Sequence, residues 1–194
     1  MSTRALLVLL LSLTLLASAT AGPTTEQIVS ELKQLQSKLI RRFPPRYIIM
    51  SQFVAQLVVR AETVPATIDW SAFAYNTLLI PTDAALGLSG ILAPPQTAEN
   101  FVRLFQIVSF NIIRGMRPFA ALKALPVDSS ISLVFKNGRL FRKKVKPGWA
   151  LAPGTSVALT QKGKPRAAWS QIVDGDLHKG SSFIAHGVNR MQTP

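Results

Sequence analysis

The sequence predicts a single α+β domain, with helices in the first half of the chain and antiparallel strands in the second half. Apolar residues recur at helical spacing in three segments before residue 115, and short strand-like runs separated by turn residues follow after residue 130. Helices followed by strands are typical of the α+β class. The chain has 194 residues, 48% of them hydrophobic, and no cysteine, so one core without disulfides must stabilise it.

The first 21 residues have the features of a secretory signal peptide. Arg4 supplies a positive start, residues 5–17 form an almost unbroken apolar run, and Ala19-Thr20-Ala21 is a small-residue cleavage pattern. An uncleaved N-terminal anchor is the alternative. We expect a secreted mature chain without stable membrane insertion, because no second apolar segment of spanning length follows. The predicted division is 1–21 signal peptide, 22–45 N-terminal amphipathic helix and 46–194 main domain.

Two helices are expected at the start of the mature chain. Thr24 and Gln27 form a capping box, and Glu31 is expected on the polar side of the helix that follows. The apolar side of this helix comprises Ile28, Leu32, Leu35 and Leu39. A second helix is expected to begin near Tyr47 and to end before Pro65.

A strand, a proline corner and a short helix are expected between residues 77 and 87. Thr77 to Ile80 is an aliphatic run, and Pro81 keeps the preceding residue extended. Thr82 and Asp83 both offer side-chain oxygens that can cap a helix beginning at Ala84.

A further helix is expected after Thr97, its N-cap, with apolar residues continuing to Ile112 and with Gly115 closing it. One or two helical turns should follow between Pro118 and Pro126.

Two hairpins are expected in the second half. Residues 131–135 and 140–145 flank Asn137-Gly138, a sequence that favours a two-residue turn. Residues 157–160 and 166–173 flank a second turn at 162–165.

Two of these segments resemble the fasciclin domain. The order of residues from Thr77 to Leu86 is similar to its opening motif, and Ile184 to Met191 is similar to its last strand. The pattern around His186-Gly187-Val188 is closest to that of plant fasciclin-like arabinogalactan proteins. Asn111 stands where the family has a histidine, and Asn189 where it usually has an acid. The residues that carry the resemblance are Thr77, Pro81, Thr82, Asp83, Phe110, His186 and Val188.

The resemblance implies helices packed on a wedge of antiparallel sheet, with the hairpins in the C-terminal half. It implies an extracellular module for cell adhesion or for organising the matrix or cell wall, without enzymatic activity or a cofactor. The partners would be proteins or acidic glycans. The ligand and the oligomeric state are left open.

No catalytic or metal-binding pattern stands out. His178 and His186 are the two histidines, and neither cysteine nor an acidic cluster accompanies them. We expect His186 to be a strand residue hydrogen-bonded to the backbone rather than a ligand or base.

The charge distribution points to a polyanion. The sequence carries a net charge of +13, and nine basic residues without any acid lie between residues 136 and 166. An acidic polysaccharide fits a secreted protein better than nucleic acid does. A basic face that only maintains solubility is the alternative. The candidate polyanion-binding residues are Lys136, Arg139, Arg142, Lys143, Lys144, Lys146, Lys162, Lys164 and Arg166.

A second function is also open, that of a small secreted basic protein acting on membranes or microbes. It depends on the amphipathic helix at residues 26–42 binding anionic lipid.

Overall fold

The computed structural model describes residues 22–42, 44–63, 68–135, 139–144, 157–165 and 168–191. The predicted signal peptide lies outside this range. The predicted α+β class is confirmed. The helices are α2 (Thr25–Ile40), α3 (Ile48–Thr63), α4 (Asp83–Gly87), α5 (Ala98–Ser109) and α6 (Phe119–Ala124), with a 3-10 helix η2 (Trp70–Ala72). The strands are β1 (Asn76–Pro81), β2 (Ile112–Ile113), β3 (Ser130–Ser132), β4 (Arg139–Lys144), β5 (Val157–Thr160), β6 (Ser170–Lys179) and β7 (Phe183–Val188).

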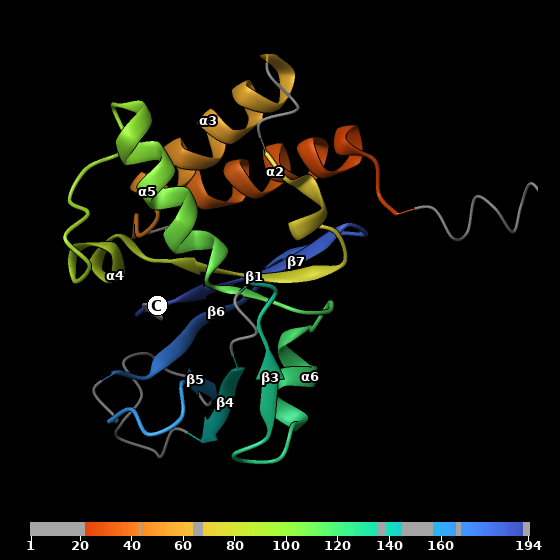
Figure 1. The fold of residues 1–194 in the computed structure, drawn as a ribbon, viewed down its shortest axis with the longest axis vertical. Helices are drawn as coiled ribbons and strands as arrows, with labels where there is room; N and C mark the ends of the chain where they lie inside the picture. Colours follow the sequence, from red (N-terminus) through yellow and green to blue (C-terminus); the bar gives the residue numbers. More distant parts are fainter. Residues whose placement is uncertain are drawn as a thin grey trace, which may run out of the picture.

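The described strands form one sheet in the order β2-β1-β7-β6-β5-β4-β3 (Figure 1). A bridge between Ile113, at the end of β2, and Leu133, just after β3, joins the two edges, so the sheet is nearly closed. β1 and β7 pair in parallel, and all other neighbouring strands pair antiparallel. The prediction of an antiparallel sheet is therefore corrected at β1 and β7, whose pairing joins distant parts of the chain.

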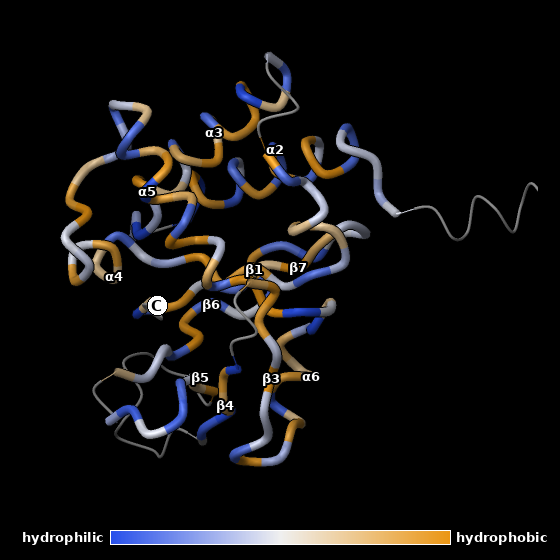
Figure 2. The backbone as a smooth tube through the Cα atoms, in the orientation of Figure 1, coloured by the Kyte–Doolittle hydropathy of each residue, from blue (hydrophilic) through white to orange (hydrophobic). Residues whose placement is uncertain are grey.

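Two apolar cores lie on opposite sides of β1. Leu78 and Ile80 belong to the core under the helices, which Figure 1 shows above the sheet, whereas Leu79 belongs to a second core that includes Leu122 of α6. Successive side chains of a strand point to opposite faces. Because both faces are covered, every residue of β1 and of β7 is buried, which explains why both strands are largely apolar. In Figure 2 apolar colouring is seen near β1 and on parts of the helices above it.

The predicted helix after Thr97 is shorter than expected. α5 ends at Ser109, and Ile112 instead pairs with Leu78 of β1. The apolar periodicity of α5 continues beyond Ser109 because the helix and Ile112 of β2 face the same core.

The first predicted hairpin is confirmed as an antiparallel pair, but its turn is not the expected one. Ser132 pairs with Arg139, so the connection is longer than a two-residue turn, and Asn137-Gly138 lies outside the described residues. Leu133 pairs with Ile113 instead. The second hairpin is confirmed, with Leu159 opposite Ser170.

Tyr47 connects the start of α3 to the last two strands. Its hydroxyl donates to Asp174 Oδ2 at 2.6 Å, and Arg42 forms an ion pair with the same carboxylate. Burial, together with the bond and charge of Asp174, raises the pKa of Tyr47 far above its usual value, so the phenol remains protonated. The hydroxyl lies directly against Gly187, where a Cβ would be 1.9 Å from it. Glycine is therefore required at this position.

Replacing Gly187 with alanine should destabilise the fold by at least about 2 kcal/mol, because Tyr47 must leave its place and Asp174 then loses a hydrogen bond. Urea unfolding measures this. Gly87→Ala is the matched control, since its Cβ would only contact Leu92 at 3.7 Å, and it should change stability by less than about 0.5 kcal/mol. Equal stabilities of the two variants would contradict this role of Gly187.

Candidate functional site

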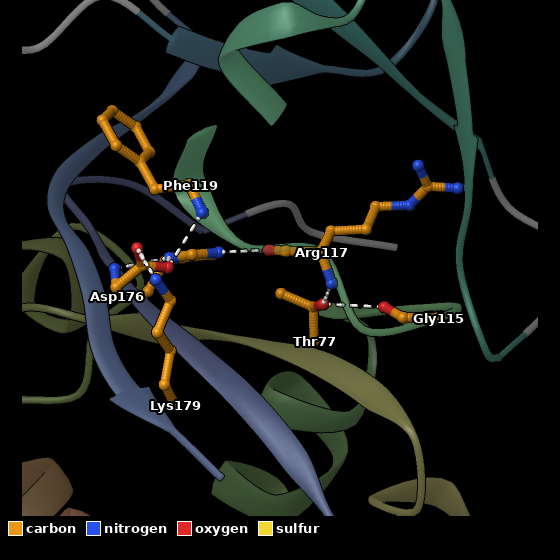
Figure 3. Close-up of polar contacts among 7 residues, drawn as sticks. Thr77, Gly115, Arg117, Phe119, Asp176 and Lys179 are labelled. Atoms are coloured by element: carbon orange, nitrogen blue, oxygen red, sulfur yellow. Dashed lines mark hydrogen bonds and ion pairs between the residues drawn. The ribbon is translucent and has the colours of Figure 1, made fainter. Parts of the chain in front are cut away.

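Thr77 organises the segment that follows β2. Its hydroxyl donates to the Gly115 carbonyl at 2.7 Å and accepts from the Arg117 N–H at 2.8 Å (Figure 3). The Thr77 side chain is fully buried. This motif residue therefore satisfies backbone groups of a neighbouring turn and presents nothing to a ligand.

Thr82 and Asp83 cap two different helices. Thr82 Oγ1 accepts from the Ala85 N–H at 3.2 Å and caps α4, as predicted. The carboxylate of Asp83 instead accepts from the N–H groups of Ile48 and Ile49, at 2.9 and 3.0 Å, and so caps α3. A carboxylate at a helix N-terminus satisfies free donors and complements the dipole. Pro81 is buried at the end of β1.

His186 is a buried backbone bridge. Its Nδ1 accepts from the Asp176 N–H at 2.8 Å, so the ring proton is on Nε2, which donates to the Arg117 carbonyl at 2.8 Å. Burial lowers the pKa of His186, and the ring is neutral at pH 7. The side chain is fully buried in β7, with both nitrogens occupied by the backbone.

Asp176 contacts Phe119 and Lys179 at the left of Figure 3. Its carboxylate accepts from the Phe119 N–H at 2.8 Å and pairs with Lys179 at 3.1 Å. Burial alone would raise the pKa of Asp176, but these two contacts outweigh it and lower the pKa. Asp176 thus connects the first turn of α6 to β6.

The other motif positions are structural as well. Val188 is fully buried, and its carbonyl accepts from the Thr82 N–H at 2.9 Å. Phe110 caps the C-terminus of α5. Asn111, at the position where the family has histidine, is fully buried and donates to the Ile107 carbonyl at 2.9 Å.

Glu31 is a buried carboxylate on α2, so its predicted place on the polar side of the helix is wrong. It accepts from the N–H groups of Ser181 and Ser182, at 2.8 and 2.9 Å, and from the Ser181 hydroxyl at 2.9 Å. His178 Nε2 lies 3.1 Å from its other oxygen. Burial alone would raise the pKa of Glu31, but these hydrogen bonds lower it to about 2. Burial lowers the pKa of His178 more than Glu31 raises it.

The predicted basic residues do not all share one surface. Arg142 is buried, and its guanidinium donates to the Lys123 carbonyl at 3.1 Å, which leaves it out of any exposed patch. Arg139 is exposed at the start of β4, and Lys162 and Lys164 are exposed in the turn between β5 and β6. Lys136, Lys146 and Arg166 lie outside the described residues, as does the side chain of Lys144.

Lys143 lines a hollow of about 400 Å³ together with the turn that carries Lys162 and Lys164. We call it the aromatic hollow, because Phe141 and Trp169 also line it. Lys143 forms an ion pair with Asp128, and its Nζ lies 5.9 Å from the centre of the Trp169 ring.

A second hollow, of about 150 Å³, adjoins the first. Ser89 and Arg190 line it, so we call it the arginine hollow. Gln161 and Lys164 line both hollows, which are therefore neighbours. The sequence indicated the lysines of this site but not Trp169, Phe141 or Arg190, which come from three different segments.

The comparison with solved structures finds 11 similar chains. The chain is similar to a FAS1 domain pair from the insect cell adhesion molecule fasciclin I, with 15% sequence identity and a TM-score of 0.47, over 73% of this chain and 44% of that one. The chain thus spans less than half the length of that domain pair. No protein-family model and no curated protein matches the sequence. The resemblance to the plant branch stays a prediction.

The described residues include no cluster of three or more histidine, cysteine, aspartate or glutamate side chains suited to a metal. Within the same residues, no helix combines the length and the apolar character needed to cross a membrane.

Replacing Glu31 with glutamine should destabilise the protein by roughly 2 to 3 kcal/mol at pH 7. The folded pKa of about 2 lies below the ordinary glutamate value of 4.5, so this contribution is complete above about pH 4.5 and disappears as the pH falls toward 2. Urea unfolding of both proteins between pH 7 and pH 2 should show the difference shrinking. Glu62→Gln, which removes an exposed carboxylate paired with Lys33, is the control and should show little difference at any pH. A constant gap for Glu31→Gln would contradict the assignment.

Both histidines should carry a single proton, on Nε2, at pH 6.5 and above. His186 Nε2 faces a carbonyl and His178 Nε2 faces the Glu31 carboxylate. Nitrogen-15 NMR of the imidazoles distinguishes this tautomer from the Nδ1–H form and from the imidazolium. An imidazolium signal for either residue at pH 6.5 would show that its pKa is not lowered.

Proposed function

We propose that the mature chain is a secreted, non-catalytic adhesion or matrix module that binds extracellular partners through its cationic surface. The observation that carries this proposal is the exposure of Lys162 and Lys164 in one turn beside Lys143, at the end of the sheet remote from α2 (Figure 1). Clustered exposed cations attract polyanions by long-range electrostatics. Acidic glycans and acidic extracellular proteins are the partner classes that fit a secreted protein.

The roles of the fasciclin-like motif residues support a binding module over an enzyme. Thr77, Thr82 and Asp83 bond to backbone groups, and His186 has both ring nitrogens occupied by the backbone. A general base needs a nitrogen or oxygen within reach of a substrate proton, which these side chains do not offer. Placement in a plant cell wall or another extracellular matrix follows from the sequence resemblance and belongs to the proposal.

The alternative action on membranes or microbes has less support. It required the apolar side of α2 to meet lipid, but Ile28, Leu32 and Leu35 are buried in the core shared with α3. A covered apolar face does not insert into a membrane surface without unfolding of the contact.

The mature chain, residues 22–194, should bind immobilised polygalacturonate and should not bind dextran, a neutral glycan. Binding should weaken steeply between about 50 and 300 mM salt, because counterions are released when cations contact a polyanion. Anionic lipid vesicles serve as a further comparison. Absence of binding to polygalacturonate at low salt, or stronger binding to the vesicles, would overturn the proposal.

A further inference from the structure

We propose that the aromatic hollow and the arginine hollow together form one binding site for a chain of acidic sugars. This inference rests on the proposed function and assigns a particular site and ligand class to it. The two hollows share Gln161 and Lys164, so they adjoin at the turn that carries these residues. A polymer that spans both hollows crosses Lys164 at its middle, which favours an extended chain over a compact anion.

The charges of the site suit a polymer with repeated negative groups. Four cationic side chains and one carboxylate line the two hollows. Lys143 and Lys162 belong to the aromatic hollow, Arg190 belongs to the arginine hollow, and Lys164 belongs to both. Cations spread along a surface match carboxylates on successive sugars, whereas a single small anion would meet only part of the set.

The aromatic rings favour a sugar over other polyanions. Lys143 Nζ lies 5.9 Å from the centre of the Trp169 ring, and Phe141 lines the same hollow. A carboxylate that binds Lys143 therefore brings the rest of its sugar ring beside the indole and the phenyl ring. Binding pockets combine apolar or aromatic walls with a few fixed polar groups in this way. Acidic polypeptides have no rigid apolar ring face beside each carboxylate.

Asp128 acts as a competitor for the ligand. Its carboxylate pairs with Lys143, while the Asp128 side chain itself is 61% exposed. A sugar carboxylate must replace it on Lys143 or share the cation with it. Removing this negative charge should therefore strengthen binding. Asparagine tolerates the positive φ of 65° at this residue, and the Asp128 N–H to Arg142 carbonyl bond does not involve the side chain, so Asp128→Asn should keep the local fold.

Three variants of the mature chain test the site by isothermal titration with polygalacturonate at about 50 mM salt. Lys162→Ser with Lys164→Ser should weaken binding roughly tenfold, and Asp128→Asn should strengthen it about threefold. Phe141→Leu should weaken binding about fivefold, while binding of poly-glutamate should stay unchanged. The matched control, Lys38→Ser with Arg41→Ser at the C-terminal end of α2, also removes two exposed cations and should retain most of the affinity. Thermal unfolding confirms that each variant is folded.

The outcomes separate the site from the general function. If the unmodified chain does not bind polygalacturonate, the proposed function fails and the site fails with it. If it binds, but the lysine variant and Asp128→Asn bind equally well, the site is wrong while the proposed function stands. If Phe141→Leu weakens the binding of poly-glutamate as much as the binding of polygalacturonate, the proposed recognition of the sugar ring is wrong.

Discussion

The parallel pairing of β1 with β7 is the constraint on which the rest of the structure depends. These strands are buried on both faces, so their backbone groups must find partners within the sheet and their side chains must fill two cores. At the two ends of the pair, backbone groups are satisfied by residues just outside β1. The Thr82 N–H donates to the Val188 carbonyl at one end, and the Tyr75 N–H donates to the Ser182 carbonyl at 2.6 Å at the other. The fasciclin-like motifs lie along this pair because they contain the side chains that complete it.

Buried polar side chains then fix the position of everything around these strands. His186 connects β7 to the backbone at Asp176 and Arg117, and Glu31 binds the turn between β6 and β7 from α2. Each of these groups would be costly to bury without its partners, so an alternative packing of α2 or of the last hairpin leaves donors or acceptors unsatisfied. The polar contacts therefore specify one arrangement, while the apolar cores supply most of the stability.

Features determined by neighbouring residues could be predicted from the sequence, and features determined by distant contacts could not. The capping box at Thr24, the cap at Thr82 and the second hairpin depend on residues a few positions apart. The sequence pattern predicts that Asp83 caps the helix beside it, but its carboxylate caps α3. The fold brings the N–H groups of Ile48 and Ile49 within hydrogen-bond distance of Asp83, and no pattern of neighbouring residues indicates this contact.

Arg142 and Trp169 illustrate the same limit within the candidate site. Along β4, Phe141 and Lys143 line the aromatic hollow, while Arg142 points to the other face and is buried against Lys123. Successive side chains of a strand point to opposite faces, so neighbouring basic residues of β4 lie on different faces of the sheet. Fewer of them can contact one ligand than a run of basic residues in the sequence suggests. Trp169 reaches the hollow only because β5 and β6 pair, which adds an aromatic wall that the charge pattern could not indicate.

Several acidic side chains bind groups of the protein itself, away from the candidate site. The sequence has nine acids, and four of them, Glu31, Asp83, Asp174 and Asp176, accept hydrogen bonds from backbone N–H groups or a phenol of another segment. Their charges are directed at backbone N–H groups, a phenol or an adjacent cation. Lysine and arginine carry long apolar stems that let their charged groups reach solvent. Asp128 is the one carboxylate among the described residues that lines the candidate site, where it opposes a polyanion.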